Sequence, residues 1–384
     1  MRRIAEIETL RAMAVLMVLA EHMPFDLFYW RTAWYDFSIT YFRGSAGVDL
    51  FFAISGFVIA RSLLPGLAQA RQAGRAGRYL AGFWLRRVFR LWPAAWLWLA
   101  VPLWLTVAFN QSGAFHTIIG NIHAAAAAVL NVANLYLAHT IMRRPDTAFM
   151  HYWSLSEEEQ FYLLLPLLAL VLRRWLVWLL VALAFYQVVM PPTFLAALTR
   201  PSCLAVGVLL AIAEARPFYA RLAPAILGRG RWAGPVAGVV LIAALGFQQA
   251  AIAQLHEGRG WAWGLQAPLA GLLVFIASFD RGYLLAPGPL RQAMSWLGAR
   301  SYSLYLCHIP AYAVVQEAQF RIWGHDYQVP AAQGFLMMAA ALPLALLAAE
   351  ATYRLVEMPA RTTGKAIAAR LWTRPTLAAA PRYE

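Results

Sequence analysis

Long apolar stretches alternate with short arginine-bearing stretches along almost the whole chain. About 20 consecutive apolar residues are enough for a helix to cross a bilayer. Stretches that reach or approach this length lie at residues 5–23, 47–65, 88–108, 155–172, 175–190, 202–215, 235–254, 264–279, 302–321 and 332–355. The pattern predicts an all-α fold, a polytopic transmembrane bundle of about ten spans.

An alanine-rich stretch at 121–139 is a further candidate span, but it contains Asn121, His123, Asn131 and Asn134, which are unfavourable against lipid. Cytoplasmic loops of membrane proteins carry an excess of arginine and lysine. If 121–139 does not cross, most arginine-bearing loops fall on one side together with both termini. If it crosses, many of them move outside. We therefore predict ten spans with cytoplasmic N- and C-termini.

This topology predicts one transmembrane domain over residues 1–360 and a partly disordered cytoplasmic tail over 361–384. The segment 110–154 becomes a long extracytoplasmic loop, and loops of such length are commonly functional. We find no internal repeat in the sequence, which argues against a transporter built from paired halves.

The composition agrees with a membrane protein. Hydrophobic residues make up 61% of the 384 positions and charged residues 13%, whereas soluble domains carry about 25% charged residues. The net charge of +14 could suggest a nucleic-acid partner, but Lys365 is the only lysine and the arginines cluster between apolar stretches. Cys203 and Cys307 both lie in apolar stretches, so we predict neither a disulfide framework nor a metal site.

Ionisable residues inside a bilayer are costly and are therefore functional candidates. Arg11 and His22 are eleven residues apart, about three helical turns, so they share nearly one face and lie about 16 Å apart along the axis. An imidazole can act as a general base that deprotonates a hydroxyl group. Asp49, at the outer end of the next apolar stretch, is placed to orient His22. The alternative is that His22 only meets water and headgroups at a helix end.

Two further charged motifs have both a functional and a structural interpretation. Three glutamates precede an apolar helix: Glu157, Glu158 and Glu159. Stabilisation of the helix N-terminus explains a glutamate that is exposed to solvent, but it explains less well a glutamate that faces the interior. Arg87 and Arg90 suit a phosphate clamp at the cytoplasmic end of the third span, although membrane anchoring explains them equally well.

Near the C-terminus, His308 is a second histidine within an apolar stretch, and Glu357 closes the last predicted helix. For each of these residues, a functional role and a role in helix packing stay equally open.

Together these motifs resemble the acyltransferase-3 family of bacterial multi-helix membrane acyltransferases. The resemblance covers positions 8 to 359, nearly the whole chain. The matching segments are Arg11 with His22, Gly47 to Phe57, Arg87 to Arg90 before Pro93, Trp153 to Tyr162, Ser301 to Pro310, and Glu357 to Pro359.

The resemblance implies transfer of an acyl group, usually acetyl from acetyl-CoA, to a hydroxyl of a glycan or another extracytoplasmic acceptor. It also implies that His22, Arg11, Arg87, Arg90 and Glu357 are functional positions. Departures from the usual motifs, at Glu8-Thr9, at Glu21 and at Cys307-His308-Ile309, leave the role of His308 open.

From these residues we predict a mechanism. Its catalytic residues are His22, Asp49 and Glu158, its acyl-CoA-binding residues are Arg11, Arg87 and Arg90, and its further functional residues are Trp153, Ser154, His308 and Glu357. CoA phosphates would stay at the basic cytoplasmic segment 61–90, and the pantetheine arm would pass Arg11. His22, supported by Asp49 or Glu158, would deprotonate the acceptor, either for direct transfer or after transient acylation of a side chain.

The expected partners are acyl-CoA as donor substrate, a glycan or other hydroxyl acceptor, and the lipid of a bacterial cytoplasmic (inner) membrane. We expect no tightly bound cofactor, metal or nucleic acid. The rival hypothesis is a transporter or flippase whose buried charges line the path of its substrate.

Overall fold

The computed structural model describes residues 4–28, 32–140, 146–189, 193–254, 263–324 and 331–373, and in these ranges every regular element is a helix. The all-α prediction is therefore confirmed. The longer helices are α1 (Ala5–His22), α3 (Ala46–Gln72), α4 (Ala76–Ala108), α7 (Tyr152–Leu172), α11 (Pro201–Glu214), α12 (Ala233–Gln254), α14 (Gln266–Ser278), α16 (Ser301–Trp323), α17 (Ala331–Thr352) and α18 (Met358–Thr373). The shorter helices are α2 (Ala33–Tyr41), α5 (Ile118–Val129), α6 (Ala133–Thr140), α8 (Leu176–Ala184), α9 (Tyr186–Val189), α10 (Phe194–Leu198) and α15 (Pro289–Ala299).

Each predicted apolar stretch lies on one or two of these helices. By length and composition, five helical segments of the described residues are able to cross a membrane, and they are Ala46–Gln72, Ala76–Ala108, Tyr152–Ala184, Ala233–Ala251 and Gly334–Arg370. These segments support the expectation of a membrane protein. The count of ten spans and the cytoplasmic location of the termini stay predictions.

The alanine-rich stretch 121–139 is not one continuous helix. It divides into α5 and α6, and Asn131 between them has a φ of 57°, a left-handed conformation that asparagine tolerates. The two helices have 12 and 8 residues. Their lengths, about 18 Å and 12 Å, fall short of the roughly 30 Å core of a bilayer. This division fits the interpretation of 110–154 as a non-spanning segment.

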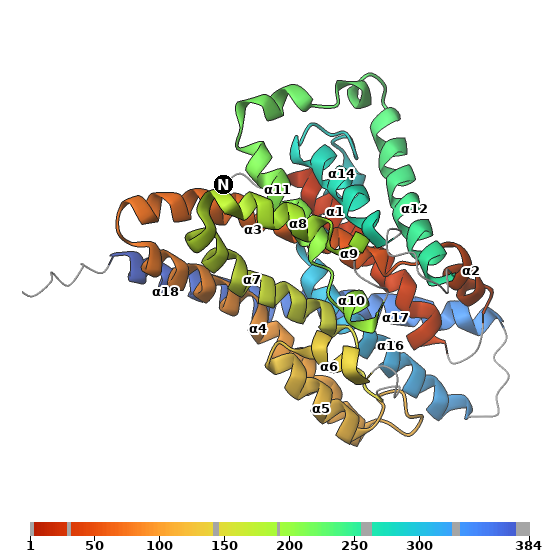
Figure 1. The fold of residues 1–384 in the computed structure, drawn as a ribbon. Coiled ribbons are helices and arrows are strands. Elements are labelled where there is room, and N and C mark those ends of the chain that lie inside the picture. The colour runs from red at the N-terminus through yellow and green to blue at the C-terminus, as the bar shows by residue number, and fades with distance from the viewer. Residues whose placement is uncertain are drawn as a thin grey trace, which may run out of the picture.

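The centre of the bundle is formed by α1, α3, α11 and α14, which lie together in Figure 1. Helices α3 and α11 touch through their backbones at two glycines. A Cβ atom added to Gly207 would lie 2.1 Å from the carbonyl oxygen of Ala53, and one added to Gly56 would lie 2.1 Å from that of Leu204. Small residues allow this close approach between membrane helices.

Helix α18 lies alongside α4 (Figure 1), where Gly364 meets Phe89. The predicted boundary at 360 therefore falls inside a helix that continues to Thr373, while 374–384 lie outside the described residues. A π-helical turn, Tyr353–Glu357, joins α17 to α18. The packing of α18 brings the basic residues that follow this turn close to the arginines of α4.

Gly207→Ala tests the contact between α3 and α11. The added methyl group meets a backbone carbonyl that cannot move without displacing its helix, so we expect the free energy of unfolding to fall by about 1–3 kcal/mol. Thermal unfolding of the purified protein in detergent measures this change. The matched control is Gly77→Ala in α4, where nothing lies within 4 Å of the added atom. Equal melting temperatures for the two variants would contradict the proposed packing.

Candidate active site

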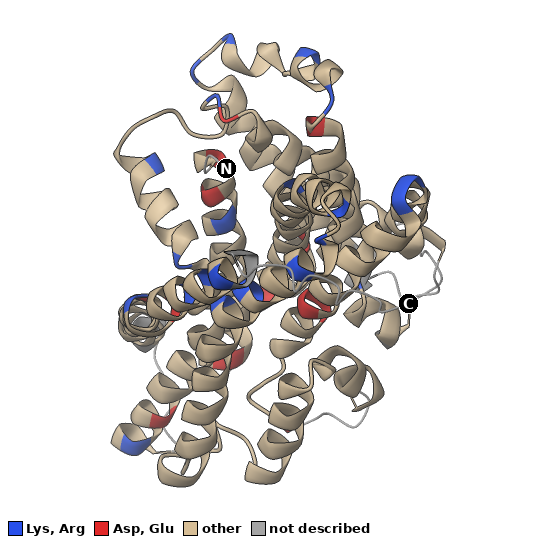
Figure 2. Ribbon diagram, turned by 90° about the vertical axis from the view of Figure 1, so that its left-hand side faces the viewer, with Lys and Arg blue, Asp and Glu red and all other residues tan. Residues whose placement is uncertain are grey.

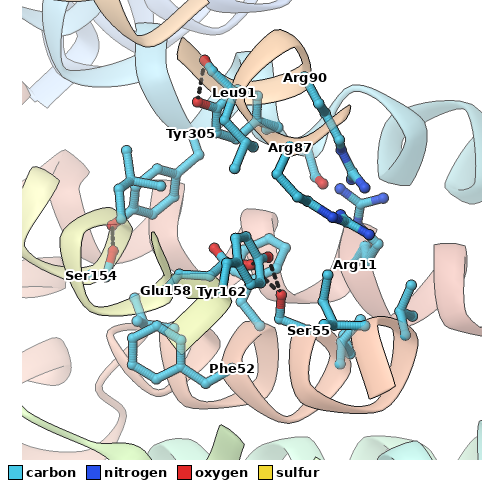
Figure 3. Close-up of a pocket in the computed structure, with 18 residues that line it drawn as sticks. Arg11, Phe52, Ser55, Arg87, Arg90, Leu91, Ser154, Glu158, Tyr162 and Tyr305 are labelled. Atoms are coloured by element: carbon cyan, nitrogen blue, oxygen red, sulfur yellow. Dashed lines mark hydrogen bonds between the residues drawn. The ribbon is translucent and has the colours of Figure 1, made fainter. Parts of the chain in front are cut away.

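A pocket opens between α1, α3, α4, α7 and α16, and its empty space, with the open solvent at its mouth included, is about 720 Å³. Figure 3 shows Arg11, Arg87 and Arg90 at one end and Ser154 with Tyr305 at the other. The walls between these ends are mostly apolar. They are formed by Val48, Phe51, Phe52, Ile54, Val58, Ile59, Leu91 and Leu155.

The cationic end of the pocket combines one arginine of α1 with two of α4. Arg11 lies 3.6 Å from the carboxylate of Glu8. For Arg87 and Arg90, no described carboxylate lies within ion-pair distance, and the buried Nε of Arg90 has no hydrogen-bond partner. A partly desolvated guanidinium without a counter-charge is costly. The three side chains that the sequence grouped as the acyl-CoA-binding set thus meet in a site suited to an anion.

Arg87 is held in place by aromatic rings. Its guanidinium carbon lies 5.5 Å from the centre of the Phe83 ring and 5.4 Å from that of the Tyr162 ring. These cation–π contacts orient the side chain without neutralising its charge.

Glu158 lies in the middle of the pocket and not beside His22. Its carboxylate accepts hydrogen bonds from the hydroxyl groups of Ser55 and Tyr162, whose oxygens are 2.5 Å apart. The expectation that Glu158 supports His22 is therefore wrong in its geometry. The reason is that the start of α7 packs against the middle of α3, level with the arginines.

The cationic end continues into a second cavity on the side of the molecule where α4 meets α18. This cavity shares Arg87 and Arg90 with the pocket and adds Arg86, Arg361 and Lys365. In Figure 2, which looks at this side of the molecule, basic ribbon segments are more frequent than acidic ones. The basic residues thus lead from the surface to the pocket. A third cavity, which shares Arg86 and Lys365, extends this basic surface further.

The opposite end of the pocket is closed by two hydroxyl groups. The Ser154 hydroxyl lies 2.6 Å from that of Tyr305, and Tyr305 donates a hydrogen bond of 2.9 Å to the backbone carbonyl of His151. The residues that line the pocket do not include His22 or His308. The two histidines that the sequence singled out therefore lie outside the pocket, next to the end closed by Ser154 and Tyr305.

His22 lies at the last turn of α1 and contacts Asp26. Its Nδ1 is 2.5 Å from the Asp26 carboxylate, which is brought back towards it by the π-helical turn Met23–Leu27. An ionised carboxylate only accepts, so Nδ1 carries the hydrogen and Nε2 of the neutral ring keeps its lone pair. This pair has the arrangement of a general base with an orienting carboxylate. Asp26 is a candidate that the sequence interpretation missed.

The prediction that Asp49 orients His22 is wrong in its geometry. Asp49 is fully buried and pairs with Arg200 at 2.8 Å. The Arg200 guanidinium in turn lies 5.1 Å from the centre of the Trp153 ring. Asp49 and Trp153 thus take part in one buried contact between α3, α7 and the start of α11, behind the pocket wall.

Glu357, at the end of the π-helical turn before α18, is buried and accepts a hydrogen bond of 3.0 Å from the hydroxyl of Ser303 in α16. It also lies 3.3 Å from Arg361. Glu357 thus connects α16 to the basic segment of α18. Among the described residues, no three His, Cys, Asp or Glu side chains are arranged to hold a metal ion.

The model of a family described as "Acyltransferase domain" matches residues 4–350. The chain belongs to this acyltransferase family. The resemblance seen in the sequence motifs is thereby confirmed.

Named relatives agree with this assignment. The peptidoglycan O-acetyltransferase OatA of Listeria monocytogenes is 27% identical over 94% of this chain and 56% of its own length. The putative peptidoglycan O-acetyltransferase YrhL of Bacillus subtilis is 26% identical over the same shares. A putative O-acetyltransferase of Staphylococcus aureus is 32% identical over 45% of this chain and 26% of its own. The chain thus spans about half the length of the first two relatives. No solved structure matches it.

Asp26→Asn tests the pairing at His22. The amide keeps the size of the side chain but removes the negative charge that stabilises a protonated imidazole, so we expect kcat for acyl transfer to fall by about 10- to 1,000-fold. The KM for the donor is expected to stay unchanged. The control is Asp146→Asn, because Asp146 forms an exposed pair of 2.7 Å with His116 on the loop. Full activity of Asp26→Asn would show that this carboxylate has no role in the reaction.

Proposed function

We propose that this protein is a membrane O-acetyltransferase of bacterial cytoplasmic membranes. It moves an acetyl group from cytoplasmic acetyl-CoA to a hydroxyl of an extracytoplasmic glycan, and the names of its relatives favour peptidoglycan as the acceptor. The observation that carries the proposal is the position of Arg87 and Arg90, which line both the basic surface cavity and the pocket that leads into the bundle.

The donor fits this shape in two parts. The nucleotide of CoA carries several phosphate charges, which arginine and lysine bind by charge-assisted hydrogen bonds. Arg86, Arg361 and Lys365 offer such charges outside the pocket, and Arg87 and Arg90 offer them at its entrance. The pantetheine arm is narrow and uncharged, and it suits the apolar walls of the pocket beyond them.

The acetyl group at the end of that arm would reach the hydroxyl pair of Ser154 and Tyr305. Tyr305 donates its single hydroxyl hydrogen to the carbonyl of His151, so Ser154 is the group that can turn its hydroxyl hydrogen to the thioester carbonyl oxygen, on which negative charge develops during attack. Ser154 belongs to the motif that the sequence assigned to a functional role, and its position at the end of the pocket supports this assignment.

The reaction joins the acceptor oxygen to the acyl carbon, breaks the bond between this carbon and the CoA sulfur, and moves the acceptor proton to a base. His22, with Nδ1 held by Asp26, provides a lone pair at Nε2 for that proton. A transporter or flippase was the rival interpretation of the buried charges. The match of nearly the whole chain to an acyltransferase domain favours acyl transfer.

Calorimetric binding of acetyl-CoA in detergent tests the donor site. Each arginine contributes a charge-assisted hydrogen bond worth about 1.5–3 kcal/mol. The double variant Arg87→Ala/Arg90→Ala is therefore expected to raise the Kd for acetyl-CoA by about 100-fold or more. A matched double variant, Arg216→Ala/Arg229→Ala, removes two exposed arginines elsewhere and is expected to bind as the wild type does. No binding by the folded wild type, or equal binding by both variants, would contradict the proposal.

A further inference from the structure

The donor pocket and the general base are separated by histidine rings. The pocket ends at Ser154 and Tyr305, and the ring of His308 lies next to the rings of both Tyr305 and His22. The centre of the His308 ring is 5.7 Å from that of Tyr305 and 5.0 Å from that of His22. A thioester held at the end of the pocket and a hydroxyl held at His22 would therefore both lie next to His308.

His308 is fully buried, and its ring has a fixed orientation. Nδ1 lies 2.7 Å from the carbonyl oxygen of Tyr305, which can only accept, so Nδ1 carries the hydrogen of the neutral ring. Nε2 then holds a lone pair, and within the part of the chain that the structure describes this buried nitrogen has no hydrogen-bond partner. A buried polar atom without a partner calls for an explanation, and a catalytic role is one of the few available.

A second histidine supports the same conclusion. The ring of His151 lies 5.6 Å from that of His308 and is also buried, and neither of its nitrogens has a hydrogen-bond partner of good geometry among the described residues. Three unpartnered nitrogens thus lie in two rings that touch, immediately beyond the hydroxyl pair that ends the pocket. Burying polar nitrogens without partners is costly, which favours a functional role for these two rings.

We propose that His308 is the nucleophile that carries the acetyl group from the donor pocket to the acceptor side. The proposal rests on the proposed acetyl-CoA-dependent function and names the residue that forms the covalent intermediate. In this scheme His22 acts only in the second half of the reaction.

The first step joins Nε2 of His308 to the acetyl carbon, and the bond from this carbon to the CoA sulfur breaks. CoA leaves as a thiolate that takes a proton from cytoplasmic water. The resulting acetylimidazolium keeps its Nδ1 hydrogen on the Tyr305 carbonyl. In the second step, the acceptor oxygen attacks the acetyl carbon while its proton passes to Nε2 of His22. The carbon–nitrogen bond breaks, and His308 returns to its neutral form.

The test uses labelled CoA and needs no acceptor. If a covalent intermediate forms, the first step can run forwards and backwards without an acceptor. The full-length protein in detergent is therefore expected to incorporate labelled CoA into acetyl-CoA when no glycan is present. His308→Gln is expected to lower the rate of exchange by about 100-fold or more. His123→Gln, an exposed histidine of α5, is the matched control and is expected to exchange as the wild type does.

His22→Ala separates the two halves of the reaction. We expect it to stop transfer to de-O-acetylated peptidoglycan fragments while exchange of CoA continues. The Kd for acetyl-CoA is measured for each variant, because loss of binding by His308→Gln would show a structural role. We expect this Kd to change by less than about twofold, since His308 lies outside the pocket.

The outcomes separate this inference from the function on which it rests. Transfer by the wild type without any exchange would overturn the role of His308 and leave the acetyltransferase intact. Exchange that is lost in His151→Gln and retained in His308→Gln would also overturn it, because His151 would then be the carrier. Absence of both transfer and donor binding in the folded wild type would contradict the proposed function itself.

Discussion

The cost of keeping charge inside an apolar helix bundle governs the arrangement of this protein. Some buried charges are paired with residues outside their own helix, as Asp49 is with Arg200 and Glu21 with Arg43, and these pairs help to fix how the helices pack. Arg87 and Arg90 lack such partners among the described residues, and both face cavities. The paired charges therefore hold the fold together, whereas the unpaired charges are available to a ligand.

The same constraint explains why the site is divided. Under the proposed function, a donor with several phosphates stays at a basic aqueous surface, and a glycan acceptor on the other side of the membrane does not reach that surface. The bundle therefore has to carry only the acyl group between them. A narrow apolar pocket that begins at arginines and ends at Ser154 and Tyr305, followed by buried histidine rings, has the arrangement that this task requires.

Much of the helical fold and of the cationic end of the site could be predicted from the sequence, because the length of an apolar stretch and the position of a charge depend only on local composition. The apolar stretches predicted the positions of the helices. The spacing of Arg11 and His22 predicted that both lie on nearly one face of their helix, and in the structure both side chains lie on the side of α1 next to α16. Asp26 was missed because the predicted span stopped at residue 23, whereas a π-helical turn continues over Met23–Leu27. The contact of Tyr305 with His151 joins residues about 150 positions apart, and only tertiary packing brings them together.

The most direct test of the account is a structure of the complex with a thioether analogue of acetyl-CoA that cannot transfer its acyl group. The account predicts phosphate oxygens within hydrogen-bond distance of Arg87 and Arg90, with the carbonyl of the analogue at the hydroxyl groups of Ser154 and Tyr305, on the side of the pocket next to His308. A CoA molecule bound away from these arginines, or an arm that does not enter the pocket, would contradict it.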